Sequence, residues 1–219
     1  MGIREEKERQ LFEEMKQFDL NFGDQIICGL DEAGRGPLMG GVFAAAVVLD
    51  YGKEILGLKD SKKISEKKRF LLEVLIKKEA KAWAIGYATE KEVDSLGIQK
   101  SNFLAFERAY QELAEKLKVE RLKALIDGNY HGIDIPNQEM IIKGDAKSLA
   151  ISAASILAKT ARDRYVIEVC HVKYPEYHFD SNKGYGTAEH IEAIKRHGLT
   201  EFHRKSFCRK WSDESSETI

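Results

Sequence analysis

Acidic residues follow three apolar runs of the sequence and could share one metal site. These residues are Asp31 with its neighbour Glu32, Asp127 and Asp145. A single Asp after a strand is a common turn residue, but ligands gather at strand ends in open α/β sheets. Carboxylates that converge there repel one another unless a cation neutralises them, and Mg²⁺ and Mn²⁺ accept all-oxygen ligand sets. Two such ions about 3.5–4 Å apart serve in-line displacement at phosphorus, so the pattern predicts a divalent-metal site for phosphoryl chemistry.

A glycine-rich segment follows the first pair of carboxylates. Gly34 and Gly36 flank Arg35, and because glycine has no Cβ, this segment lets another backbone approach closely. The segment is neither a Walker A loop nor Gly-x-Gly-x-x-Gly, so it does not support binding of a nucleotide cofactor. Taken alone, a plain turn is its simpler interpretation.

Polar and basic residues recur where a polyanion could be met. One stripe lies on a single face of a long predicted helix and consists of Ser148, Ser152, Ser155, Lys159 and Arg162. Serine is a poor filler of solvated helix surface, which favours contact with a ligand. Basic residues also gather within 59–81 and within 195–210, and the second stretch includes His203 and Arg204. Such runs are usually solvated surface, but beside a metal site they favour a track for a phosphate backbone.

The elements expected to position these residues are five strands and several helices. Strands are predicted over 25–30, 41–49, 81–88, 122–126 and 139–142, and helices over 4–19, 65–78, 89–97, 102–117, 148–171 and 188–197. The helix over 65–78 has apolar residues at Phe70, Leu71, Val74 and Leu75. Early strands with short connections should pair antiparallel, and later strands reached through helices can pair in parallel. This order predicts an α/β fold with a mixed central sheet, helices on both faces and no second core.

Length and composition fit one globular domain. The 219 residues are 43% hydrophobic and 32% charged, which argues against disorder. The formal net charge of −1 neither indicates nor excludes a nucleic-acid partner, since a polyanion responds to a local basic face. Three cysteines without a Cys-x-x-Cys spacing, a charged first segment and only short apolar runs indicate a cytoplasmic protein. We expect an N-terminal helical extension over 1–24, a single catalytic domain over 25–211 that ends in a helical extension, and a disordered tail over 212–219.

Seven sequence blocks resemble, in the same order, those of ribonuclease HII, the type 2 ribonuclease H family. They are CGLDEAGRGP (28–37), KDSK (59–62), LIDGN (125–129), KGD (143–145), ISAASILAKTARD (151–163), KGYGT (183–187) and HRKSF (203–207). The first block and the block on the long helix are highly specific. One departure is visible, because the family commonly has His before the Lys-Gly-Tyr block, whereas this chain has Ser181 and Asn182.

The resemblance implies a ribonuclease-H-like fold with a mixed five-stranded sheet. It implies an endonuclease that cleaves RNA in RNA–DNA hybrids and cuts 5′ of single ribonucleotides in duplex DNA, leaving 3′-hydroxyl and 5′-phosphate ends. The implied partners are therefore RNA–DNA hybrid and ribonucleotide-containing duplex DNA, the cofactor is Mg²⁺ or Mn²⁺, and no membrane is involved. A monomer is expected.

The resemblance also assigns roles to particular residues. The metal-binding, catalytic carboxylates would be Asp31, Glu32, Asp127 and Asp145. The ribose 2′-hydroxyl and its phosphates would meet Gly34, Arg35 and Gly36, and the neighbouring sugar would stack on Tyr185. Further candidates for substrate contact are Lys143, Ser148, Ser152 and Lys159, whereas Asp163 is expected to be structural.

Two other functions are compatible with parts of this pattern. A related metal-dependent DNA nuclease of the same fold would also collect carboxylates at strand ends, but the Gly-Arg-Gly turn and the Lys-Gly-Tyr block argue against it. A non-catalytic nucleic-acid-binding module would not need the four carboxylates, which are all present. Cleavage of duplexes with and without one ribonucleotide separates the three functions.

Overall fold

A mixed five-stranded sheet forms the centre of the protein in a computed structural model, which describes residues 2–119 and 122–211. Its strands are β1 (Ile27–Ala33), β2 (Val42–Val48), β3 (Ala82–Ala88), β4 (Lys123–Asp127) and β5 (Gln138–Ile141), in the order β3-β2-β1-β4-β5. β2 pairs antiparallel with both β1 and β3, while β4 pairs in parallel with both β1 and β5. The predicted mixed sheet is confirmed, although β2 and β3 pair antiparallel across a long connection rather than a short one.

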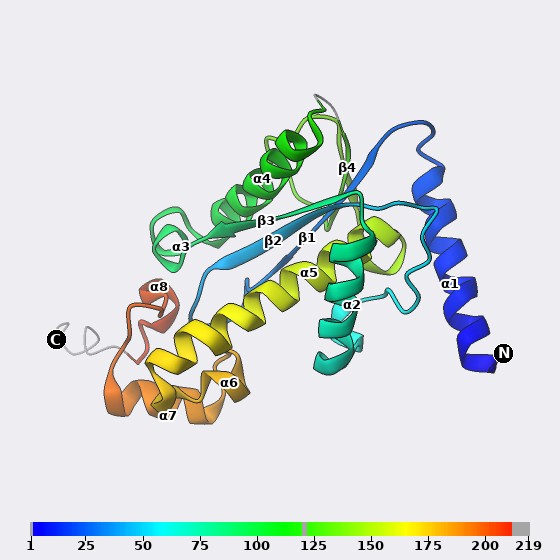
Figure 1. Cartoon of the computed structure of the whole chain (residues 1–219). Coiled ribbons are helices and arrows are strands. Elements are labelled where there is room, and N and C mark those ends of the chain that lie inside the picture. The colour runs from blue at the N-terminus through cyan, green and yellow to red at the C-terminus, as the bar shows by residue number, and fades with distance from the viewer. Residues whose placement is uncertain (1, 120–121, 212–219) are drawn as a thin grey trace.

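Helices cover both faces of this sheet, as predicted (Figure 1). Alternate residues of each strand point to opposite faces, and nearly all of them are apolar here. One face packs against α1 (Ile3–Leu20), α2 (Glu66–Glu79) and α5 (Leu149–Tyr165). The other face packs against α4 (Ile98–Leu117), which follows the short helix α3 (Glu90–Leu96). The central strands β1 and β2 are therefore buried on both sides, and the ends of the strands are where a site can open.

Two glycines in the strands let helices approach the sheet closely. A Cβ at Gly29 in β1 would lie 2.1 Å from the carbonyl carbon of Ala150 in α5. A Cβ at Gly86 in β3 would lie 1.9 Å from the carbonyl oxygen of Ala105 in α4. This close approach fixes the height of the alanine-rich helix α5 above β1.

Capping residues mark the helix boundaries that the sequence predicts. Ser65 accepts a hydrogen bond from the Lys68 amide at the start of α2, and Thr89 forms a complete capping box with Glu92 in α3. Ser148 caps α5. The buried side of α2 differs from the predicted apolar positions, because Leu72 and Ile76 are buried whereas Leu71, Val74 and Leu75 are exposed.

The C-terminal part of the chain forms a small core of its own, so the prediction of no second core is wrong. The helix α5 continues as a π-helix over Val166–His171, and α6 (Phe179–Asn182), α7 (Ala188–His197) and α8 (Lys205–Cys208) follow. The core that these helices form contains Tyr177 and Phe179, and it also contains Leu38 and Met39 from the segment after β1. These helices are therefore fastened to that segment. The predicted tail over 212–219 lies outside the described residues, and no helix of the described part has the length and apolarity that a membrane crossing needs.

Candidate active site

Asp31 and Glu32 lie within β1 rather than after it, opposite Ala45 and Ala44 of β2. Because they are neighbours in a strand, their side chains point to opposite faces of the sheet. Asp31 lies on the face that α5 covers, as do the core residues of the same register. Glu32 lies on the α4 face, where its Oε1 accepts a hydrogen bond of 3.1 Å from the hydroxyl of Tyr130.

The other two carboxylates come from the parallel half of the sheet. Asp127 is the last residue of β4, beside β1, and its Oδ1 accepts a 2.6 Å hydrogen bond from the Gly144 amide. Gly144 opens the 3₁₀ turn η2 (Gly144–Ala146), which follows β5 and carries Asp145. A backbone amide therefore ties the segment of Asp145 to the side chain of Asp127.

The four carboxylates share one electrostatic environment. Burial raises the pKa of Asp31 well above its usual range, and the charges of Glu32 and Asp127 raise it further. Burial also raises the pKa of Glu32, which the nearby cation of Arg35 opposes. Burial and the charge of Asp127 raise the pKa of Asp145. Carboxylates that destabilise one another in this way gain most from a bound cation.

The chemistry of these donors fits divalent cations. All four are carboxylates, the ligand type that Mg²⁺ and Mn²⁺ prefer. Three of the carboxylates already accept a hydrogen bond: Glu32 from the Tyr130 hydroxyl, Asp127 from the Gly144 amide and Asp31 from the Glu32 amide. Oε2 of Glu32 is buried without a hydrogen-bond partner. In the described residues no three such groups converge closely enough to form a ready-made ligand set for one ion.

A cavity of about 240 Å³ opens beside the two carboxylates of β1. It is lined by Asp31, Glu32, Ala33, Gly34, Arg35, Gly36, Ser61, Lys62, Ser155, Lys159 and Tyr185. The structure thus brings together the β1 carboxylates, the Gly-Arg-Gly segment, Lys159 and Tyr185. Asp127 and Asp145 lie next to this group without lining the cavity.

Three of the residues predicted to contact the substrate do not line this cavity. Lys143 is exposed, with a left-handed backbone before η2, and does not line the cavity. Ser148 is fully buried as the cap of α5, and Ser152 is fully buried one turn later. Of the polar stripe on α5, only Ser155 and Lys159 reach the cavity, because the start of α5 packs onto β1.

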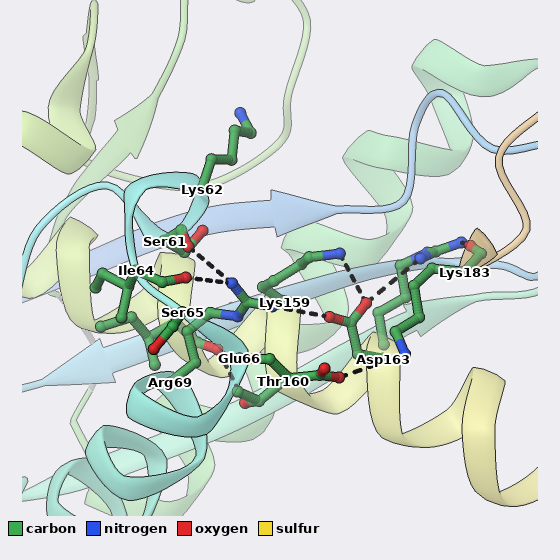
Figure 2. Close-up of polar contacts among 12 residues, drawn as sticks. Ser61, Lys62, Ile64, Ser65, Glu66, Arg69, Lys159, Thr160, Asp163 and Lys183 are labelled. Atoms are coloured by element: carbon green, nitrogen blue, oxygen red, sulfur yellow. Dashed lines mark hydrogen bonds and ion pairs between the residues drawn. The ribbon is translucent and has the colours of Figure 1, made fainter. Parts of the chain in front are cut away.

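An ion-pair network places the 3₁₀ turn η1 (Ser61–Lys63) at the cavity (Figure 2). Arg69 of α2 donates to the carbonyls of Ser61 and Ile64 and pairs with Asp163 of α5 at 3.4 Å. Asp163 is almost fully buried and also pairs with Lys159 at 2.7 Å. These contacts agree with a structural role for Asp163. Lys62 extends away from the network and lines the cavity.

Tyr130 is a site residue that the sequence analysis missed. Its hydroxyl accepts a 2.6 Å hydrogen bond from the Arg35 guanidinium while donating to Glu32. The Arg35 guanidinium also lies 5.2 Å from the centre of the Tyr130 ring. Tyr130 therefore fixes both a metal-type carboxylate and the arginine beside it. Its only signal in the sequence is its place three residues after Asp127.

Tyr185 stands at the cavity mouth on a short loop. Its side chain is 47% exposed, and its ring lies 5.7 Å from the buried guanidinium of Arg162. Asn182, at the position where the related family commonly has His, holds the base of this loop. Its amide donates to the carbonyl of Tyr177 and accepts from the amide of Gly184, both at 2.7 Å.

The second basic stretch is not uniformly a surface track. His203 and Arg204 are buried, with 3% and 0% exposure. Arg69, from the first stretch, is likewise engaged with carbonyls and Asp163. The prediction that the two stretches as a whole form a phosphate track is therefore wrong for these residues, because they are buried or engaged by partners inside the protein.

Comparison with known proteins identifies the family. The family model described as Ribonuclease HII matches residues 28–210. A ribonuclease HII from Janthinobacterium sp. (strain Marseille) is 52% identical over 185 residues, which are 84% of this chain and 86% of that protein. The ribonuclease H2 structure from Pyrococcus horikoshii OT3 matches with a TM-score of 0.71 at 25% identity, covering 88% of this chain and 99% of that one. Bst-RNase HIII, solved in complex with Mn²⁺, shares the fold at 16% identity, with a TM-score of 0.65 over 91% of this chain and 67% of that one. The chain therefore belongs to the ribonuclease HII family and is a metal-dependent ribonuclease.

Proposed function

We propose that this ribonuclease cleaves RNA in RNA–DNA hybrids and also cuts on the 5′ side of a single ribonucleotide embedded in duplex DNA. The products carry 3′-hydroxyl and 5′-phosphate ends. One observation carries this proposal. The β1 carboxylates, the Gly-Arg-Gly segment and Tyr185 line a single cavity, so a metal-type site adjoins groups suited to a sugar and its phosphate.

Asp31, Glu32, Asp127 and Asp145 are the proposed ligands of two divalent ions. The raised pKa values of Asp31 and Asp145 reflect burial and mutual repulsion, which bound cations relieve. When bound, the ions supply a nucleophilic water and stabilise the leaving 3′ oxygen. Mg²⁺ and Mn²⁺ are both proposed, and the complex of the structural relative Bst-RNase HIII with Mn²⁺ supports the second.

The remaining residues of the cavity bind and orient the substrate. Main-chain groups of Gly34 and Gly36 approach the ribose without a side chain in the way, and the 2′-hydroxyl is the group that distinguishes RNA from DNA. The cationic side chains of Lys62 and Lys159 face the same cavity and suit phosphates. Tyr185 offers an exposed ring for stacking on the adjacent sugar. Because none of these contacts involves a base edge, we expect little sequence preference.

A monomeric enzyme is part of the same proposal. We propose residues 25–211 as the catalytic domain, with α1 as an N-terminal helix packed on the same core through Phe12 and Met15. A cytoplasmic location belongs to the same proposal. Light scattering of the purified protein at micromolar concentration should give the mass of one chain, and a dimer mass would contradict the monomer.

Cleavage mapping on matched duplexes tests the activity. Three 5′-labelled duplexes of one sequence are compared: all DNA, DNA with one ribonucleotide, and a full RNA–DNA hybrid, each with Mg²⁺ or Mn²⁺. We expect a single cut 5′ of the ribonucleotide, multiple cuts in the hybrid and none in DNA. Cleavage of the all-DNA duplex would identify a DNA nuclease instead, and binding of the duplexes without cleavage by either metal would identify a binding module.

A further inference from the structure

Arg204 lies at the centre of the turn that follows β1. Its guanidinium is fully buried and donates five hydrogen bonds of 2.5–3.1 Å to backbone carbonyls. The acceptors all belong to the segment from Gly34 to Gly41, here called the glycine turn: Gly34, Arg35, Pro37, Gly40 and Gly41. Burial lowers the pKa of Arg204 to about 10, so the group stays cationic at neutral pH. Within the described residues it makes no ion pair, and carbonyl dipoles surround its charge.

This arrangement determines where the amides of the glycine turn point. In a planar trans peptide the C=O and the following N–H point in opposite directions. Because the carbonyls of Gly34 and Arg35 are directed at Arg204, the N–H groups of Arg35 and Gly36 are directed away from it. Both residues line the cavity, and neither amide donates to any residue in the described part of the chain. Two free N–H donors therefore face the place proposed for the ribose and its phosphate.

The neighbouring residue fastens the loop of Tyr185 in a similar way. The amide of Thr200 donates to Nδ1 of His203, so His203 carries its proton on Nε2. His203 therefore donates through Nε2 to Nε2 of His190 at 3.0 Å. Because Nε2 of His190 is the acceptor, His190 carries its own proton on Nδ1 and donates it to the carbonyl of Tyr185 at 2.9 Å. His203 and Arg204 are consecutive residues, so one segment holds both the loop of Tyr185 and the glycine turn.

Backbone hydrogen bonds join the same three segments. The amide of Leu38 donates to the carbonyl of Gly184, and the amide of Gly40 donates to the carbonyl of Phe202. The amide of Arg204 donates in turn to Leu38. The glycine turn, the Tyr185 loop and the segment 202–204 are therefore one connected unit, in which Arg204 supplies the largest number of bonds to the turn.

We propose that Arg204 is the positioning residue for ribonucleotide recognition. By holding the carbonyls of the glycine turn inward, it presents the N–H groups of Arg35 and Gly36 to the 2′-hydroxyl and phosphate of the substrate. Arg204 itself is buried and does not contact the substrate. This inference rests on the proposed function, since it concerns how the same cavity selects a ribonucleotide.

The first test uses Arg204→Lys, which keeps the charge but replaces a planar fork of five donors by one ammonium. Affinities for the single-ribonucleotide duplex and for the all-DNA duplex are measured with chelator present, so that no cleavage occurs. We expect the preference for the ribonucleotide to fall about tenfold, because hydrogen bonds that orient the turn are lost. Affinity for all-DNA duplex should change less than about twofold, since it depends on phosphate contacts elsewhere.

A control variant and a replacement variant complete this test. Arg164→Gln removes an arginine of α5 that pairs with the buried Glu73 at 2.8 Å, outside the cavity, and should keep the full preference. A ratio of two affinities in one sample is unaffected by the fraction of protein that is folded. Should Arg204→Lys fold too poorly to measure, Arg204→Gln at reduced temperature serves instead and should lose the preference likewise.

Hydrogen exchange separates this inference from the proposed function. Amides of Leu38 and Gly40 should exchange about tenfold faster in Arg204→Lys than in wild type, without substrate, and should be unchanged in Arg164→Gln. A wild-type protein that binds both duplexes equally overturns the proposed function and, with it, the recognition role. A wild-type preference that persists in Arg204→Lys, or unchanged exchange in the glycine turn, overturns the inference alone.

Discussion

Asp31 is a buried carboxylate on the central strand, raised in pKa by burial, by Glu32 and by Asp127. We predict that Asp31→Asn lowers the cleavage rate by at least about 100-fold, because a neutral amide no longer attracts a cation in a site that depends on electrostatics. Binding of duplex in chelator should stay near wild type. The matched control is Asp19→Asn, the same change at a buried aspartate outside the cavity. Near-normal cleavage by Asp31→Asn in Mg²⁺ would contradict the assignment.

Tyr185 allows a prediction about substrate binding alone. Tyr185→Ala should weaken binding of the single-ribonucleotide duplex by about 1–3 kcal/mol, the usual range for lost stacking. Tyr185→Phe should keep most of that energy, since no hydrogen bond of its hydroxyl appears among the described residues. Metal affinity, titrated without nucleic acid, should be the same in both variants. If Tyr185→Ala cuts a single ribonucleotide as well as wild type does, the stacking role is wrong.

For single residues, the sequence predicts which side chains can do chemistry more readily than it predicts which partners surround a side chain in the fold. The β1 carboxylates, the Gly-Arg-Gly segment and Tyr185 were identified from type and motif, and they line one cavity. Arg204 stood in a basic run that looked like surface, because its five acceptors are carbonyls of a segment far away in the chain. Every residue has a backbone carbonyl, so the sequence does not indicate which carbonyls a side chain will contact. The role of Asn182 could not be predicted for the same reason, because its partners are main-chain groups.

The element formed by η1 and the start of α2 carries four lysines that differ in their surroundings. Lys62 lines the cavity, Lys63 pairs with Asp60, and Lys68 pairs with Glu8 of α1 at 3.1 Å. Neutralising Lys62, Lys63, Lys67 and Lys68 together should weaken binding to all duplexes alike. It should also flatten the plot of log affinity against log salt by up to about 0.9 per lost phosphate contact.

The control for this prediction is the single variant Lys68→Gln. Its ammonium already pairs with Glu8, so the change should leave the salt dependence of binding almost intact. Fluorescence anisotropy across a salt series measures both quantities. An unchanged slope in the quadruple variant would place the phosphate track on another surface.

The histidine pair that fastens the Tyr185 loop predicts a pH dependence of stability. Burial, with the neighbouring His190, lowers the pKa of His203 to about 3, whereas an unfolded His titrates near 6.5. The unfolded state therefore binds more protons below pH 6.5, and the stabilising contribution of neutral His203 is lost as the pH falls. Between pH 7 and pH 5 this amounts to about 2 kcal/mol. Denaturant unfolding measures the free energy of unfolding of wild type and His203→Gln at both pH values. Between pH 7 and pH 5, wild type should lose about 2 kcal/mol more than the variant. An equal loss in both proteins would contradict the role of His203.

Elements were predictable where local signals and periodicity agreed. Capping residues placed the starts of α2 and α3, and short apolar runs identified the strands. The buried side of α2 was not determined by its sequence, because apolar residues occupy 70, 71, 72, 74, 75 and 76 and surround the helix. The side of α2 that packs against α5 is the buried one, and it contains Leu72 and Ile76. The C-terminal core escaped prediction since its short helices bury their residues mainly against one another and against Leu38 and Met39.

For the whole molecule, Asp19 links the N-terminal helix to the catalytic core. Its Oδ2 accepts from the Ala150 amide at 3.0 Å, at the start of α5, and from the hydroxyl of Tyr51 at 2.9 Å. Burial raises its pKa to about 6, against 3.8 for an ordinary Asp, so the folded state binds this proton more tightly than the unfolded state does, and its stability rises as pH falls from 6 toward 4. Asp19→Asn, neutral and nearly isosteric, should match or exceed wild type in free energy of unfolding at pH 7.

The same variant has a second expected signature. Between pH 7 and pH 5 wild-type stability should gain the contribution of Asp19 protonation, and Asp19→Asn should lack it. Urea titrations at the two pH values measure the difference. A variant that is several kcal/mol less stable than wild type at pH 7 would show instead that the ionised carboxylate stabilises the start of α5.

The chain order of the recognition unit has a consequence for biosynthesis. All four carboxylates have been translated by residue 145, whereas Arg204 is added some sixty residues later. A nascent chain that has emerged only through α5 therefore contains every acidic group of the centre but lacks the guanidinium that turns the amides of the glycine turn outward. On our proposal, discrimination between ribonucleotide and deoxyribonucleotide is acquired late in synthesis, after the acidic centre itself, and a product of premature termination before residue 204 would lack it.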